Sequence, residues 1–211
     1  MNTPDVTPIK EKNFNIGDPL FQEDFITTLY EWLPKNREIV IACVGTDRST
    51  GDSYGPFVGS MLEEQGEGSF HVLGTIEEPL HAVNLEERIK EVKMKYRNPF
   101  IIAVDACLGS VSHIGSLTLA KGPLAPGAAL KKDLPKVGDV HINGIVNVQG
   151  FMEFAVLQNT RLKTVIDLSS ATVSALHGLE EKWKQNRSVA FPSRAFSHIR
   201  KAQRTRLAND A

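Results

Sequence analysis

The chain has 211 residues, a formal net charge of −1 and 41% hydrophobic residues, which suits one substantial α/β domain with a buried core. A near-neutral charge gives no general attraction to nucleic acid or to a membrane surface. No apolar run approaches the roughly 20 residues that cross a bilayer, and the polar N-terminus lacks the apolar centre of a signal peptide. We therefore expect a cytoplasmic protein with no membrane and no direct nucleic-acid partner.

The first half of the chain alternates between helical and strand patterns. Apolar residues at helical spacing, or in short β-branched runs, predict in turn a helix over 20–32, a strand over 38–44, a helix over 55–64, a strand over 71–76, a helix over 85–96 and a buried strand over 99–105. Pro56 suits the first turn of its helix, and Asn84 suits an N-cap.

The second half is less regular. In chain order it predicts an edge strand over 115–120 that could run antiparallel, a long loop over 122–138, a β-branched segment over 139–148, a buried helix over 150–160, a strand over 163–168 and a helix from Ser169 or Ser170 to about Trp183. Together the elements predict a three-layer α/β/α sandwich with a mostly parallel sheet. We expect residues 1–18 to be a flexible lead, 19–185 the single α/β domain, and 186–211 a basic tail or terminal helix.

Polar side chains gather where the predicted strands end. Loops that follow parallel strands lie at the same edge of a sheet, and ligands of open α/β sheets bind there. The residues that this places together are Asp47 and Asp52, then Glu77, Glu78 and His81, then Asp105, and finally His141. Asp105, directly after a buried apolar strand, is the strongest functional candidate, whereas Asp52 could be only a turn or N-cap residue and His141 only a loop histidine.

Two chemistries fit this set of residues. Two neighbouring carboxyl groups cannot both ionise freely, so they can supply a general acid and a general base together. Alternatively, Asp52, Asp105 and His141 could hold a divalent metal with an open position for water. The sequence contains no Walker A, G-x-G-x-x-G, C-x-x-C or H-E-x-x-H motif, and we expect Cys43 and Cys107 to be packing residues.

Four segments in order carry a family resemblance: Val44–Pro56, Val104–Gly109, Gly122–Gly127 and Val137–Asn147. They resemble the YyaC-type spore proteases of spore-forming bacteria. That family is similar to the spore germination protease, which degrades DNA-binding proteins of spores, and more remotely to the hydrogenase maturation endopeptidases. The resemblance implies a phosphorylase/hydrolase-like α/β/α fold.

The resemblance also implies roles for residues. Asp52, Asp105 and His141 match a nickel-contacting trio of the maturation enzymes, and Asp52 and Asp105 match the catalytic aspartates of the germination protease. Two positions depart from the maturation enzymes, because Thr46 stands where they carry Asn, and Asp52 where they often carry Glu. We expect the substrate pocket to include the following side chains: Thr46, Asp47, Glu77, His81 and Asn143.

The function implied is a sporulation-related endopeptidase that cleaves a spore protein, located in the forespore or spore core. A divalent metal remains an open alternative to a metal-free aspartate pair, and a homo-oligomer is also open. Two other functions are compatible with the residues: a catalytically silent protein that binds a peptide or metal, and a small-molecule hydrolase on the same fold.

Overall fold

The computed structural model describes residues 11–66, 68–126 and 135–190. Its helices and strands follow in this order: β1 (Glu11–Asn15), α1 (Phe21–Tyr30), β2 (Ile39–Cys43), α2 (Tyr54–Glu64), β3 (Phe70–Leu73), α3 (Leu85–Lys95), β4 (Phe100–Gly109), the short 3-10 helix η1 (Val111–His113), β5 (Ser116–Lys121), β6 (Val140–Val148), α4 (Glu153–Gln158) and α5 (Leu162–Ala190).

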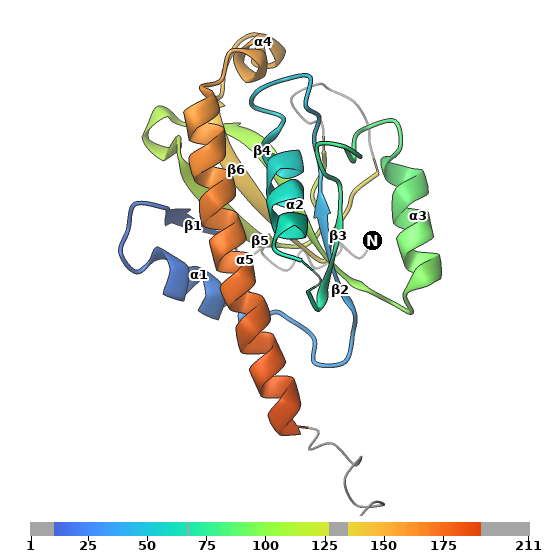
Figure 1. The fold of residues 1–211 in the computed structure, drawn as a ribbon. Helices are drawn as coiled ribbons and strands as arrows, with labels where there is room; N and C mark the ends of the chain where they lie inside the picture. The colour runs from blue at the N-terminus through green and yellow to red at the C-terminus, as the bar shows by residue number, and fades with distance from the viewer. Residues whose placement is uncertain (1–10, 67, 127–134, 191–211) are drawn as a thin grey trace, which may run out of the picture.

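One mixed sheet of six strands organises the chain, in the order β1-β5-β6-β4-β2-β3. The four strands β6, β4, β2 and β3 are parallel, and β5 and β1 add an antiparallel flank. Helices α1, α2 and α5 pack on one face of this sheet and α3 on the other (Figure 1). The predicted α/β fold with helices on both faces of a mostly parallel sheet is confirmed.

Strand alternation separates the two halves of the core. In β2, for example, Ile39, Ile41 and Cys43 face the larger cluster with α1, α2 and α5, whereas Val40 and Ala42 face the smaller cluster with α3. All five β2 residues are buried, as expected of a parallel strand that is covered on both faces.

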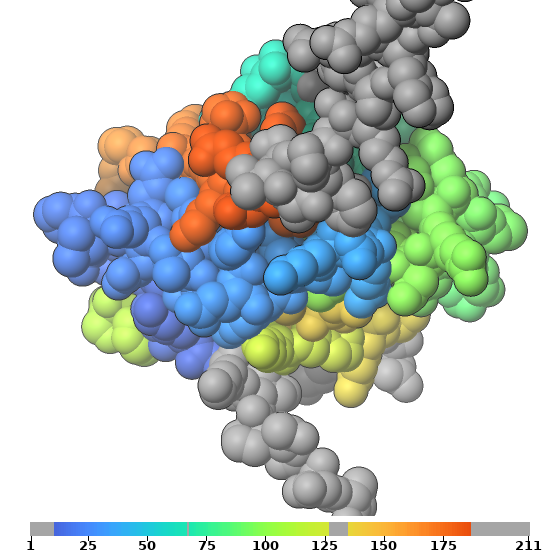
Figure 2. Space-filling model, turned by 90° about the horizontal axis from the view of Figure 1, so that it is seen from below, coloured from blue at the N-terminus to red at the C-terminus, as the bar shows by residue number. Residues whose placement is uncertain are grey.

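Seen from below, the segments that lead to β2 (blue) cover this end of the molecule between α5 (orange) and α3 (green) (Figure 2).

The prediction of a flexible lead over residues 1–18 is wrong for residues 11–15. These form β1, which pairs antiparallel with β5 from Glu11↔Ala120 to Asn15↔Ser116. Phe14 is 5% exposed and packs against Phe21 and Phe25 of α1. Because β1 covers its outer side, β5 is antiparallel as predicted but is not an edge strand. Residues 1–10 lie outside the described part.

The predicted strand over 163–168 is also wrong, because these residues begin α5. Their β-branched composition favours a strand locally, but the buried residues recur at helical spacing through Val165, Leu168, Thr172, Leu176 and Leu179. Tertiary packing of that stripe against α1 and α2 overrides the local preference. The helix predicted from Ser169 or Ser170 is therefore the continuation of α5, and the part of the predicted basic tail beyond residue 190 lies outside the described residues.

The helix predicted over 150–160 is present as α4 but is not a buried helix. Leu157 is buried, whereas Phe151 is 92% exposed and Phe154 is 54% exposed. The predicted loop over 122–138 is described at its two ends, where Leu124 and Val137 pair in an antiparallel bridge. Residues 127–134 lie outside the described part.

Candidate active site

The candidate site lies where β4 extends beyond the end of its neighbour β2. The β2–β4 ladder ends with Cys43 opposite Val104, and β4 continues beside β6 to Gly109. Asp105 is therefore the first β4 residue beyond the end of β2. The segment from Gly45 to Ser53 follows β2 at this edge, which is where open α/β sheets place their ligands.

Gly45 sets the course of the loop that carries Asp52. Its φ is +143°, a conformation that favours glycine, and a Cβ atom there would collide with the backbone carbonyl oxygen of Asp52. The Thr46 N–H donates to that same carbonyl oxygen at 3.2 Å, and the Gly51 N–H donates to the Leu157 carbonyl of α4 at 2.9 Å. These contacts fix Asp52 at the end of the loop.

Asp52 is not the N-cap of the helix that follows. That position belongs to Ser53, whose hydroxyl donates to the Thr50 carbonyl at 2.6 Å. The sequence left open an N-cap role for Asp52, and the structure excludes it. Asp52 lies in the turn that precedes α2, and its carboxyl group does not cap that helix.

The charge of Asp52 acts on Asp105. Asp105 is 7% exposed, and burial, followed by the charge of Asp52, raises its pKa well above its ordinary value, although the Ala106 N–H opposes the rise. Burial raises the pKa of Asp52 to about 6, and its hydrogen bond with Thr46 opposes that rise. No cation among the described residues contributes to either shift. The pair thus combines a deeply buried carboxyl group with a more accessible one.

A polar row extends from Asp105 across four strands. Asp105 lies opposite Asn143 of β6, Asn143 opposite Thr118 of β5, and Thr118 opposite Asn13 of β1. Residues directly opposite in register share one face of a sheet, and the alternation along β4 places this row on the face that α3 covers. The Thr118 hydroxyl donates to Asn13 Oδ1 at 2.6 Å. The row joins the candidate site to the antiparallel flank of the sheet.

Asn143 holds an unsatisfied acceptor beside Asp105. Its Oδ1 atom is buried and has no hydrogen-bond partner in the part of the chain that the structure describes. A buried acceptor without a partner costs about 1–3 kcal/mol, so a donor is expected at this position when the site is in use. Asn143 was predicted to line the substrate pocket, and this geometry is compatible with that prediction.

His141 lies on the same face of the sheet as Asp105, but it is closer to the N-terminal end of β6 than Asn143 is. It is opposite Ala103, two residues before Asp105, which corresponds to a displacement of about 7 Å along the strands. Its Nδ1 is 2.9 Å from the Gly122 carbonyl oxygen. Because a carbonyl can only accept, Nδ1 carries a proton, and in the neutral ring Nε2 is the acceptor.

This displacement bears on the predicted metal site. Within the described ranges, no three His, Cys, Asp or Glu side chains are grouped so that they could hold a metal ion. As the structure places them, Asp52, Asp105 and His141 do not form such a group, and their role as metal ligands stays a prediction. We derive no chemical step through a metal.

The remaining predicted pocket residues are less closely tied to the pair. Asp47 is exposed and accepts a hydrogen bond from the Thr46 hydroxyl at 3.4 Å. Glu77 is exposed, and His81 is half-buried, with its Nδ1 accepting from the Val83 N–H at 3.3 Å. Both lie on the segment between β3 and α3, which meets the Asp52 loop where the Gly45 N–H donates to the Leu80 carbonyl.

Tyr54, which the sequence analysis did not single out, packs on the other face of the sheet and interacts electrostatically with Asp105. Its side chain is fully buried, and its hydroxyl group lies 2.7 Å from the Thr172 hydroxyl of α5. Burial is the main cause that raises its pKa, and the charge of Asp105 contributes. Gly144, next to Asn143, leaves the space that the Tyr54 ring occupies. A buried tyrosine at a helix start has no distinctive sequence pattern.

The cysteines behave as packing residues. Both are free, Cys43 in the core and Cys107 half-buried on β4. Burial is the main cause that raises the pKa of Cys107 to about 12 and that of Cys43 above its ordinary value. Since the thiolate is the nucleophilic form, neither is prepared for nucleophilic catalysis.

Within the described residues, no helix is both long and apolar enough to cross a membrane.

The fold is shared with solved structures. It is similar to a [NiFe] hydrogenase maturation protease, HycI, from Thermococcus kodakarensis KOD1, with a TM-score of 0.50 at 15% identity over 73% of this chain and 99% of that one. A weaker likeness, to the Hydrogenase 3 Maturation protease, has a TM-score of 0.42 at 16% identity and covers 70% of this chain and 94% of that one. At these identities the likeness concerns the fold.

The family is defined by sequence. Residues 13–175 match the model of the family described as "Protein of unknown function (DUF1256)", and the chain belongs to that family. It is 52% identical over 152 residues to the "Uncharacterized protein YyaC" of Bacillus subtilis (strain 168), a match that covers 72% of this chain and 74% of that protein. The predicted relation to YyaC-type proteins is thereby confirmed.

Proposed function

We propose that this protein is a peptidase in which Asp52 and Asp105 act as a general base and a general acid. Ionised Asp52 takes a proton from a water molecule. At the same time the oxygen of that water molecule attacks the carbonyl carbon of the scissile peptide bond. Asp105 gives its proton to the leaving nitrogen as the carbon–nitrogen bond breaks. The products are a carboxylic acid and an amine.

The assignment of the two roles depends on burial. Asp105 is the more deeply buried, and its proximity to the Asp52 charge further favours its protonated form, which a general acid needs. Asp52, with a pKa of about 6, is mostly ionised at neutral pH, which a general base needs. This pairing of two carboxyl groups with different environments is the observation that carries the proposal.

The neighbouring side chains support a peptide as substrate. Asn143 Oδ1 is a buried acceptor beside Asp105, suited to a substrate N–H. His141 presents Nε2 as an acceptor on the same face, and we assign it to substrate orientation. Thr46, Asp47, Glu77 and His81 lie on the two loops at this edge and would contact the flanking substrate residues.

We propose a spore protein as the substrate. The sequence resemblance to spore proteases suggests a spore protein as substrate and the forespore as the place of action. The fold likeness to a hydrogenase maturation protease supports a protein substrate in general.

The proposal is tested with a peptide library prepared from the proteome of a spore-forming bacterium, in which new termini are identified by mass spectrometry. We expect the wild-type protein to generate a defined set of cleavages that Asp105→Asn and Asp52→Asn each abolish. Asp24→Asn, an exposed aspartate in α1, is the control and should cleave as wild type does. Equal cleavage by Asp105→Asn would refute the catalytic pair, and no cleavage by wild type would favour a silent binding protein.

A further inference from the structure

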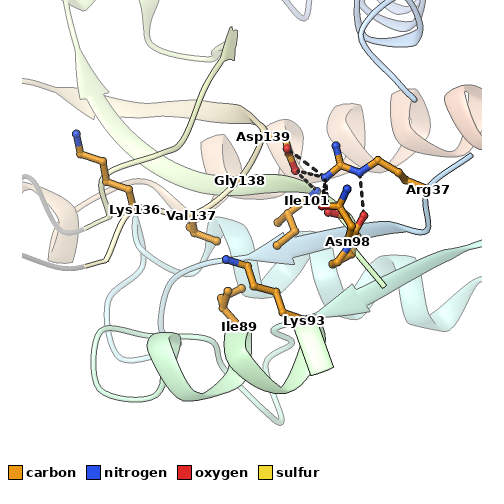
Figure 3. A pocket seen from close by; sticks show the side chains of 10 residues that line it. Arg37, Ile89, Lys93, Asn98, Ile101, Lys136, Val137, Gly138 and Asp139 are labelled. Carbon is orange, nitrogen blue, oxygen red and sulfur yellow. Dashed lines mark hydrogen bonds and ion pairs between the residues drawn. The ribbon is translucent and has the colours of Figure 1, made fainter. Parts of the chain in front are cut away.

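A cavity lies at the opposite end of the sheet from Asp105. It has a volume of about 450 Å³ and is lined by residues that precede β2, β4 and β6 and by residues of α3, including Arg37, Ile89, Lys93, Ile101, Lys136 and Asp139 (Figure 3). This volume is within the range of about 300–1,000 Å³ that is typical of small-molecule sites.

Arg37 is held rigidly at one side of this cavity. Its Nε donates to the Asn98 carbonyl at 2.8 Å and its Nη2 to the Pro99 carbonyl at 2.6 Å, and the guanidinium lies over the Phe100 ring. Nη2 also pairs with Asp139 at 3.3 Å. Within the described residues Nη1 makes no hydrogen bond, so a preorganised donor group remains available to a ligand.

Lys93 adds a positive charge that no carboxylate of the described residues balances. Its neighbours on α3 have partners: Arg88 pairs with Glu78 and Glu91, and Lys90 with Glu86. Lys93 has no ion-pair or hydrogen-bond partner in the described part of the chain. In Figure 3 its ammonium group lies beside Ile89 and Val137 in the cavity, with Arg37 and Asp139 beyond.

The charges of the lining favour an anion with two negative charges. Arg37 and Asp139 balance each other as an ion pair, and Lys93 and Lys136 leave two positive charges on the wall. A phosphate monoester carries about −1.5 to −2 charges at neutral pH and accepts hydrogen bonds from Arg and Lys. A carboxylate would balance only one of the two lysines.

One wall of the cavity is apolar. Ile89, Ile101 and Val137 are 9%, 4% and 3% exposed and belong to the core cluster beneath α3. A ligand that fills the cavity can place an apolar group against these side chains while its anionic group meets the cations.

We propose that this cavity binds a small organic phosphate, with its phosphate group at Arg37 and Lys93 and its apolar part against Ile89, Ile101 and Val137. The site is separate from the Asp52–Asp105 pair, because it opens at the N-terminal ends of the parallel strands and the pair lies toward their carboxyl ends. The proposal is independent of peptidase activity.

Titration of the full chain with phenyl phosphate, followed by ¹H–¹⁵N NMR, tests the proposal. We expect saturable shifts of the amides of Ile89, Lys93 and Ile101, with the Asn143 amide unmoved, and weaker binding as the salt concentration rises. Lys93→Gln should weaken binding about tenfold, the value of one charged hydrogen bond. Lys95→Gln is the matched control, because Lys95 is exposed on the same helix and lies over the Tyr96 ring.

Each outcome decides the matter. Saturable shifts at the cavity that Lys93→Gln weakens and Lys95→Gln does not would establish the site. Equal weakening by both variants would mean general attraction to a basic helix and would overturn it. The absence of saturable shifts, or shifts confined to the Asp105 edge, would also overturn it. Tighter binding of benzoate than of phenyl phosphate would refute the preference for a dianion.

Discussion

Asp105 of β4 and Asn143 of β6 are direct partners in the parallel ladder, and they bring a buried carboxyl group next to a buried amide oxygen that has no donor among the described residues. The relationship favours a proton on Asp105, because an ionised carboxylate would face an acceptor across the gap of about 4.8 Å between neighbouring strands. It therefore has consequences for stability as well as for catalysis.

The first prediction concerns the pH dependence of stability. Both aspartates have raised pKa values in the folded state, so between the ordinary value of 3.8 and about 6 the folded protein holds more protons at Asp52 than the unfolded chain does. Their contribution to stability is present at low pH and is lost as pH rises. Asp105→Asn removes the cost of ionising that group, so the variant should gain stability relative to wild type as pH rises above 3.8, the ordinary value of an aspartate.

Urea unfolding at a series of pH values measures this difference. Asp24→Asn should follow the wild-type curve, because Asp24 is exposed on α1. If Asp105→Asn were destabilised by the same amount at low and high pH, the raised pKa of Asp105 would be contradicted.

The second prediction concerns the rate of peptide cleavage. A general base must be ionised, so kcat/KM should rise as pH increases through about 6, the pKa of Asp52. It should fall again at a higher pH, where Asp105 loses its proton. The measurement is a pH profile for a peptide that the library experiment identifies, and a profile that is flat across the ionisation of Asp52 would argue against its role as base.

The third prediction tests whether β1 is part of the folded structure. Phe14 is 5% exposed between Phe21 and Phe25, so Phe14→Ala should lower the free energy of unfolding by about 3–5 kcal/mol. Phe151→Ala is the matched control, since Phe151 is 92% exposed, and it should change stability by less than about 0.5 kcal/mol. Similar small effects for both variants in thermal or urea unfolding would mean that residues 11–15 are indeed a loose lead.

The fourth prediction concerns the contact between β6 and Tyr54. A Cβ atom at Gly144 would lie 2.8 Å from two carbon atoms of the Tyr54 ring, and the ring is held by the hydrogen bond to Thr172. Gly144→Ala should therefore destabilise the fold by about 1–3 kcal/mol through overpacking. Gly150→Ala has open space around it and should be neutral, and equal stability of the two variants would mean that the ring can move aside.

The sequence alone determined the alternation of strands and helices from residue 38 to residue 105, because buried parallel strands and amphipathic helices have strong local patterns. It also indicated Asp105, since a carboxyl group that follows a buried apolar run stands out. It did not indicate Asn13 or Thr118, whose joint position with Asn143 depends on pairing between strands far apart in the chain.

Only the tertiary structure decided the start of α5, the strand at residues 11–15 and the position of His141. In α5, packing against two other helices outweighs β-branched composition. In β1, a short polar segment becomes a strand because the open edge of β5 supplies its hydrogen bonds. His141 lies on the same face of the sheet as Asp105. The register of β4 and β6 places it opposite Ala103, two residues before Asp105. Register arises from long-range contacts, and for that reason sequence order could predict the edge of the sheet but not which side chains meet there.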